Sequence, residues 1–228
     1  MDPNVQPPSD THPVEPRPRD SAVLAWVSFF VILAGTALSP IVGALLVLGW
    51  AKLSGTPWRA LGFVRLRRWP LALLVAVAAG VAFKLAMKSV VMPLLGAPPE
   101  NAAYHYLAGN RDAFHELVPA IVFGAGFGEE VLFRGYLFDR LGRWLGSGPR
   151  ATVATVILSS LLFAAAHFSS QGLPGVEQAL VTGLVIGTLY ARTRALPFLM
   201  VLHAVFDLTA AWIIYHGLET TVAHWFFR

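Results

Sequence analysis

The chain has 228 residues, of which 56% are hydrophobic and 13% are charged. Soluble globular domains carry about 25% charged residues, so this composition excludes that class and indicates a polytopic membrane protein. The net charge of +4 does not indicate a nucleic-acid partner, because most basic residues lie in short connectors between apolar runs. Cysteine is absent, which excludes disulfides and thiol nucleophiles, so any metal must be held by histidine and carboxylate side chains.

The N-terminal part of the chain divides into a polar tail and a long apolar run. Residues 1–20 contain six prolines among mixed charges, a composition that cannot bury enough apolar surface to fold, so we expect a flexible tail. Residues 21–51 carry no charge, a run of 31 residues against the roughly 20 needed to cross a bilayer. We expect one span here, tilted or kinked at Pro40, with a re-entrant break at Pro40 as the alternative.

Five further apolar segments predict five further spans, at residues 70–95, 116–145, 151–168, 176–190 and 196–216. Three connectors expected in the cytoplasm hold 5, 3 and 2 Lys or Arg residues, whereas the two tails and the external loops hold 2, 1, 0 and 1. The sequence therefore predicts an all-α protein of the cell membrane, with about six transmembrane helices in one domain (21–216) and both termini outside. Aromatic residues near the C-terminus indicate an interfacial tail over 217–228.

Two features of the apolar segments concern packing and lysine placement. Lys84 and Lys88 lie four residues apart on one helical face, where they either reach the membrane surface or line the protein interior and contact a substrate. Small residues, Gly124 to Gly128 in one segment and Gly183 with Gly187 in another, predict close approach of neighbouring helices.

Three ionisable side chains interrupt the third apolar segment: Glu129, Glu130 and Arg134. Each charge near the bilayer centre costs roughly 2.5 to 3.5 kcal/mol on insertion scales, so the cluster needs compensation. Glu130 and Arg134 have the four-residue spacing that favours an ion pair in a helix, which can be purely architectural. Glu129 is left over, and its partners must come from other segments or from water.

Two histidines in later apolar segments, His167 and His203, are the candidate partners of Glu129, and Asp207 follows His203 by one helical turn. A carboxylate and two imidazoles on three helices are the parts needed to activate a water and to stabilise the oxyanion formed at a carbonyl. The combination favours hydrolysis, although each histidine alone could be a hydrogen-bonded packing residue. The H-E-x-x-H and G-x-S-x-G motifs are absent.

The ordered motifs Glu129-Glu130-x-x-x-Arg134, Phe163-x-x-x-His167 and His203-x-x-x-Asp207 resemble those of the CPBP family of intramembrane proteases (CAAX proteases and bacteriocin-processing, or Abi, proteins). The resemblance covers residues 128–207. It implies that Glu129 and His167 activate water, that His203 and Asp207 support the oxyanion, and that Glu130, Arg134 and Phe163 hold the geometry.

One position departs from the family pattern. Prenyl-protein-processing members typically have Asn where this chain has Asp207, and an ionised carboxylate cannot donate a hydrogen bond. Orienting His203 is therefore the favoured role for Asp207, and the departure weakens an assignment to prenylated CAAX substrates.

The resemblance implies an endopeptidase acting on a membrane-associated protein or peptide. The alternatives are a non-catalytic immunity or scaffold protein and, less favoured, a small-molecule transporter. The family is often classed as metalloendopeptidase, and Glu129, His167 and His203 could hold one zinc ion with water in the fourth position. The same residues could act on water directly, so the cofactor expectation is either none obligatory or one zinc ion.

Overall fold

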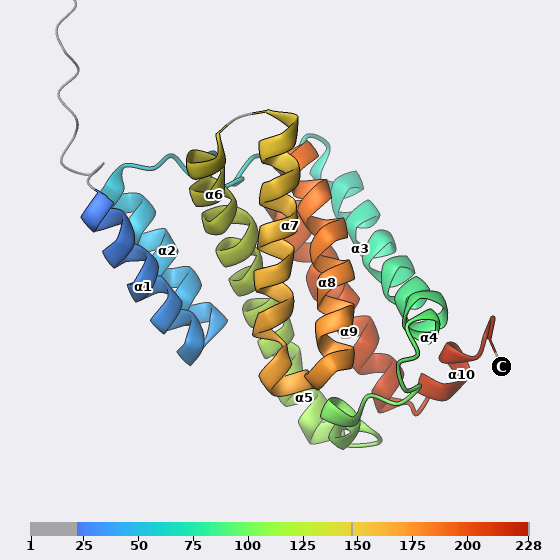
Figure 1. Ribbon diagram of the computed structural model, residues 1–228. Helices are drawn as coiled ribbons and strands as arrows, with labels where there is room; N and C mark the ends of the chain where they lie inside the picture. The colour runs from blue at the N-terminus through green and yellow to red at the C-terminus, as the bar shows by residue number, and fades with distance from the viewer. Residues whose placement is uncertain (1–21, 147, 228) are drawn as a thin grey trace, which may run out of the picture.

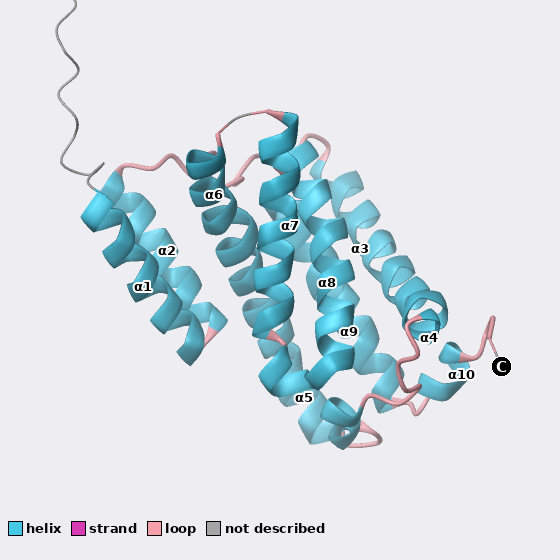
Figure 2. Cartoon of the chain, viewed as in Figure 1, coloured by secondary structure: helices cyan, strands magenta, loops and turns pink. Residues whose placement is uncertain are grey.

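The computed structural model describes residues 22–146 and 148–227, so the flexible tail expected over residues 1–20 lies outside the described residues. Helices make up most of this part of the chain, and no strand occurs in it (Figure 2). The prediction of an all-α membrane protein is confirmed. Many large apolar side chains on the outer faces of the helices are exposed, as expected for helices that contact lipid.

The first apolar run forms two short helices, α1 (Ala22–Leu38) and α2 (Pro40–Ser54), which lie side by side as an antiparallel hairpin (Figure 1). The chain is extended at Ser39, whose Oγ accepts a hydrogen bond from the backbone N–H of Ile41 and caps α2, while Pro40 occupies the first helical turn. The prediction of a single span over residues 21–51 is therefore wrong. The re-entrant break at Pro40, named as the alternative, is what the structure shows.

The hairpin also changes the expected topology. Because α1 and α2 run in opposite directions, the start of α1 lies at the same end of the bundle as the connector that follows α2 (Figure 1). That connector carries Arg59, Arg65, Arg67 and Arg68 and is expected in the cytoplasm. We expected the start of the first helix to lie on the opposite side of the membrane from this connector, and this expectation is wrong. The C-terminal helix α10 (Glu219–Ala223) does lie at the end of the bundle opposite to the connector.

Four helices of the described residues are long and apolar enough to cross a membrane. They correspond to the predicted segments that begin at residues 70, 151, 176 and 196, although α8 (Phe168–Thr193) also includes a short helical stretch before a kink at Gly172, outside the predicted segment. They are the helix made of α3 (Trp69–Ala86), η2 (Met87–Val91) and α4 (Met92–Leu94), and then α7 (Pro149–Ala166), α8 (Phe168–Thr193) and α9 (Leu196–Tyr215).

The charged segment predicted at 116–145 is a fifth long helix, built from α5 (Arg111–Pro119), η4 (Ala120–Leu137) and α6 (Phe138–Leu145). It lies between the hairpin and the other long helices and packs against α2 and α9 (Figure 1). Its middle part, η4, is a π-helix, a form that is rare in proteins and frequent at functional sites.

Glycine allows η4 to lie close to its neighbours. A Cβ atom at Gly126 would stand 2.9 Å from the carbonyl oxygen of Met200 on α9, and one at Gly128 would stand 2.8 Å from the carbonyl carbon of Pro40 at the tip of the hairpin. On α8, a Cβ atom at Gly183 would stand 3.1 Å from the Cα atom of Ser160 on α7. Close helix packing is confirmed at these three glycines but not at Gly124, where an added Cβ atom would meet nothing within 4 Å. The tip of the hairpin is held against the turn that carries Glu129.

Candidate active site

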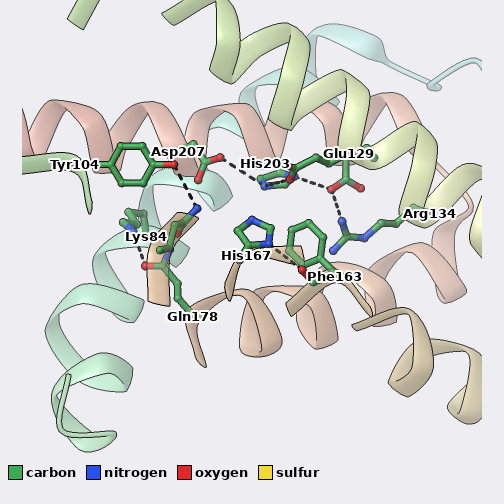
Figure 3. A network of polar contacts seen from close by, with 11 residues as sticks. Lys84, Tyr104, Glu129, Arg134, Phe163, His167, Gln178, His203 and Asp207 are labelled. Carbon is green, nitrogen blue, oxygen red and sulfur yellow. Dashed lines mark hydrogen bonds and ion pairs between the residues drawn. The ribbon is translucent and has the colours of Figure 1, made fainter. Parts of the chain in front are cut away.

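A cavity of about 330 Å³ lies inside the bundle, between η4, α7, α8, α9 and the tip of the hairpin. Its walls include Glu129, His167, His203 and Asp207, the four residues that the sequence motifs place on three separate helices. Their side chains converge in Figure 3. The structure therefore brings together all four candidate catalytic residues, with Phe163 also in the wall of the same cavity.

Glu130 is fully buried beneath the cavity and joins two helices. One oxygen, Oε1, accepts a hydrogen bond from Arg134 Nη1 at 2.9 Å and another from His203 Nδ1 at 2.7 Å. The first contact is the ion pair that the four-residue spacing predicts. The second connects Glu130 to α9 and shows that this carboxylate fixes the ring of His203 as well as neutralising Arg134.

The bond to Glu130 determines how His203 faces the cavity. A carboxylate only accepts hydrogen bonds, so Nδ1 of His203 carries the proton, and Nε2 is left for other contacts. Nε2 lies 3.6 Å from Asp207 Oδ2 and 3.9 Å from Glu129 Oε2. Glu130 thus orients the ring from the buried side, while Asp207 and Glu129 stand on the cavity side.

Glu129, which directly precedes Glu130 in η4, extends its side chain into the cavity. Its side chain is 17% exposed, and its Oε2 atom is buried with no hydrogen-bond partner among the described residues. The 3.9 Å to His203 is too long for a direct hydrogen bond. Buried carboxylate oxygens in native proteins nearly always have a donor. Oε2 of Glu130 has no partner among the described residues either, but Glu129 lines the cavity, where a water or a substrate group can supply the donor.

His167 stands at the end of α7, where its imidazole lies across the cavity from His203 (Figure 3). Its Nδ1 lies 2.8 Å from the carbonyl oxygen of Phe163, so Nδ1–H donates to that carbonyl. The lone pair therefore lies on Nε2, the ring nitrogen that is not bonded to the carbonyl of Phe163. The tautomer with a free Nε2 acceptor is the form that suits a base toward water.

The ring of Phe163 holds both histidines apart and covers Arg134. Its centroid lies 4.6 Å from the His167 ring and 5.9 Å from the His203 ring, in edge-on contacts. The Arg134 guanidinium stands over its face at 4.5 Å, a favourable cation–π geometry. Phe163 is therefore a packing element that fixes the separation of the two imidazoles.

The proposed zinc ligands do not form a metal site in this arrangement. Among the residues that the structure describes, no group of three or more His, Asp or Glu side chains is placed to hold a metal ion. Each histidine donates Nδ1–H to a protein acceptor, so only its Nε2 faces the cavity as a possible ligand. We therefore derive no chemical step through a metal.

Two further polar side chains of the cavity carried no signal in the sequence. Tyr104, in η3 (Ala102–Leu107), accepts a hydrogen bond at 3.3 Å from Gln171 Nε2 at the start of α8. Burial, together with the negative charges of Asp207 and Glu129, raises the pKa of Tyr104 to about 12, so its hydroxyl stays protonated. Tyr104 stands in a connector that hydropathy alone assigns to an external loop.

Comparison with known proteins identifies the part of the chain that carries these motifs. Residues 113–209 match the family model described as Type II CAAX prenyl endopeptidase Rce1-like. The match confirms the resemblance to the CPBP family over residues 113–209, which include the motif residues that line the cavity. No curated protein and no solved structure matches the chain.

Proposed function

We propose that this Rce1-like protein is an endopeptidase of the cell membrane that hydrolyses a peptide bond in a membrane-associated protein or peptide. The observation that carries the proposal is the unpartnered Oε2 atom of Glu129 inside a cavity that two oriented imidazoles also line. A carboxylate base, a second base and a candidate oxyanion donor stand within one enclosed space.

In the proposed reaction, Glu129 and the free Nε2 of His167 hold a water molecule. Glu129 accepts a proton from this water as its oxygen attacks the carbonyl carbon of the substrate. The tetrahedral intermediate collapses when the C–N bond breaks, and the proton held by Glu129 passes to the leaving amine. The products are a carboxylic acid and an amine, which become a carboxylate and an ammonium group when the acid proton passes to the amine. The protein returns to its starting protonation state.

The oxyanion needs a hydrogen-bond donor, and His203 is the best placed. With Nδ1–H held by Glu130 at 2.7 Å, a second proton on Nε2 makes the ring an imidazolium whose Nε2–H points into the cavity between Glu129 and Asp207. Asp207 orients this N–H at rest, which agrees with its inability to act as a donor itself. Arg134 is a positioning residue, because it acts on His203 only through Glu130.

The substrate class follows from the surroundings and from the family. The cavity lies within a bundle whose outer faces are apolar, so a substrate must be embedded in or anchored to the bilayer. The family model is named for prenylated substrates with CAAX ends. Because Asp207 replaces the Asn typical of those members, we propose a membrane-associated substrate without requiring a prenyl group.

The main alternative is a non-catalytic immunity or scaffold protein that retains the polar cluster for helix assembly. Comparative proteomics of membranes from cells with wild-type protein or Glu129→Gln separates the two functions. We expect an uncleaved protein to accumulate with Glu129→Gln at unchanged abundance of the variant. Asp139→Asn is the matched control, because Asp139 lies on the same long helix and pairs only with Arg143 at 3.0 Å. An identical set of protein ends in all three strains would contradict the proposal.

A further inference from the structure

Lys84 on α3 is buried, with 5% of its surface exposed, and it lines the same cavity as Glu129. Its Nζ atom donates a hydrogen bond to Gln178 Oε1 at 2.8 Å and stands 4.7 Å from the ring centre of Phe206. Among the described residues it forms no ion pair. A lysine of the bundle interior that has only neutral partners is unusual, because buried ammonium groups are normally paired with an anion.

Lys88, one helical turn further along, has a different environment. Its Nζ atom forms an ion pair with Glu219 at 3.1 Å and also donates to the carbonyl of Pro99. The two lysines therefore resolve the alternatives left open by their spacing. Lys88 binds the C-terminal segment, whereas Lys84 faces the interior of the protein (Figure 3).

A second cavity, of about 210 Å³, lies on the other side of Lys84. Its walls are partly polar and include Lys88, Glu100, Asn101, Gln171 and Glu219 in addition to Lys84 and Gln178. Because Lys84, Gln171 and Gln178 border both cavities, the second cavity continues from the first. Lys84 stands at the junction, with two of its three N–H donors free for a ligand.

Among the described residues, no acidic side chain that lines the two cavities (Glu100, Glu129, Asp207 or Glu219) forms an ion pair with Lys84. Asp207 shares the first cavity but faces Nε2 of His203 at 3.6 Å. Glu219 shares the second cavity but gives its Oε1 to Lys88 and to the backbone N–H of Asn101. The place for an anion beside Lys84 is thus inside the space that a substrate would occupy.

We propose that Lys84, with Gln178, binds a carboxylate of the substrate, so that the acidic end of the peptide lies in the second cavity while its scissile bond lies beside Glu129. This inference rests on the proposed function and adds a specificity-determining residue to it. The carboxylate belongs either to the C-terminus of the substrate or to an acidic side chain near it. Both present the same two oxygens to the ammonium group.

Binding to the uncleaving Glu129→Gln protein in lipid nanodiscs tests this proposal. Three fluorescent, lipidated peptides of one sequence serve as probes: one with a free C-terminus, one with a C-terminal amide, and one amide whose last residue is Glu. We expect the free acid, the Glu amide, or both to bind about 10- to 100-fold more tightly than the plain amide, as a charged hydrogen bond gives. Tight binding of only one of them identifies the source of the carboxylate.

Lys84→Met in the same background should abolish this preference, and Lys84→Arg should retain part of it. Lys52→Met is the control, since it removes a lysine charge that borders neither cavity and should leave the preference intact. If Lys84→Met does not fold, Gln178→Leu replaces it and should reduce the preference by about tenfold or less. Equal binding of all three probes by the parent protein, or an unchanged preference in Lys84→Met, would overturn the proposal.

The binding experiment can fail or succeed independently of whether the protein cleaves peptides. Binding is measured on a protein that cannot cleave, so a carboxylate preference can be present even if wild type proves to cleave nothing. In wild type that does cleave, Lys84→Met should raise KM for the acidic probe and leave KM for the plain amide unchanged. A loss of kcat on both probes would instead assign Lys84 a structural role and contradict the inference.

Discussion

Two buried glutamates of this protein, Glu130 and Glu219, form similar hydrogen bonds but differ in what those bonds hold in place. Glu130 Oε1 accepts hydrogen bonds from Arg134 and His203, and Glu219 Oε1 accepts them from Lys88 and the backbone of Asn101. Both side chains are almost completely shielded from solvent. Each therefore joins two segments through one shared oxygen.

The difference lies in the partners. Glu130 binds the imidazole of a cavity residue, so its position determines where Nε2 of His203 points. Glu219 binds a lysine of η2 and a connector, and so it attaches α10 to the bundle. Burial of a charged group therefore does not distinguish function from architecture in this protein, and the identity of the hydrogen-bond partner does.

The largest effect is expected from Arg134→Ala. This change leaves Glu130 charged with only His203 as a partner in a dry site, and breaking a buried pair costs about 3 to 5 kcal/mol. We expect a large loss of thermal stability in detergent and lower abundance in membranes. Adding Glu130→Gln to Arg134→Ala should restore much of the stability. A single variant with wild-type stability would show that the pair is not needed for folding.

Glu130→Gln should affect the reaction more than the fold. The amide oxygen can still accept from His203, but the charge that holds Nδ1–H is gone, and we expect kcat for peptide cleavage to fall about 100-fold or more. Thermal stability should change far less than in Arg134→Ala. The matched variant Glu219→Gln should keep kcat close to wild type. Equal losses of kcat in both variants would remove the distinction between the two glutamates.

Glu219→Ala should lower stability by about 1 to 3 kcal/mol, because it leaves Lys88 with only the carbonyl of Pro99 and the partly buried N–H of Asn101 without its acceptor. Its signature is a lower melting temperature together with an unchanged kcat per folded molecule. Proteolysis at the C-terminal segment should increase. A loss of kcat at full occupancy of the folded state would mean that Glu219 contributes to the reaction and not only to the fold.

The smallest effect is expected at a third pair. Arg143 and Asp139 have the same spacing as Arg134 and Glu130 and nearly the same distance, 3.0 Å, but the Arg143 side chain is 51% exposed. Exposed pairs of this kind contribute about 0.3 to 0.5 kcal/mol. Asp139→Asn should therefore shift the melting temperature barely measurably. A shift as large as that of Arg134→Ala would show that spacing, and not burial, controls the energy.

Local patterns in the sequence predicted those parts of the structure that depend on neighbours along the chain. The pairing of Glu130 with Arg134 follows from their four-residue spacing. The long apolar runs predicted the helices that are long enough to cross a membrane. The cost of placing charges in lipid singled out Glu129 before any fold was known. Its convergence with His167 and His203 followed from the family resemblance, which the match to residues 113–209 confirms.

Other features depend on contacts between distant segments and left no local signal. The bond between Glu130 and His203 joins residues 73 positions apart. The hairpin was missed because hydropathy counts apolar length, and a run of 31 residues fits one tilted helix as well as two short ones. Its tip at Pro40 is stabilised by contact with Gly128, which no periodicity reveals. The inward direction of Lys84 likewise depends on Gln178 from another helix.

The most direct test of the proposed chemistry is cleavage of a peptide by purified protein that has been treated extensively with chelator and shown by elemental analysis to be metal-poor. If Glu129 and His167 act on water directly, this protein cleaves at the wild-type rate, while Glu129→Gln and His167→Ala treated in the same way do not. Stoichiometric zinc in the untreated protein, with activity lost on its removal and regained on its return, would contradict the account and make Glu129, His167 and His203 metal ligands.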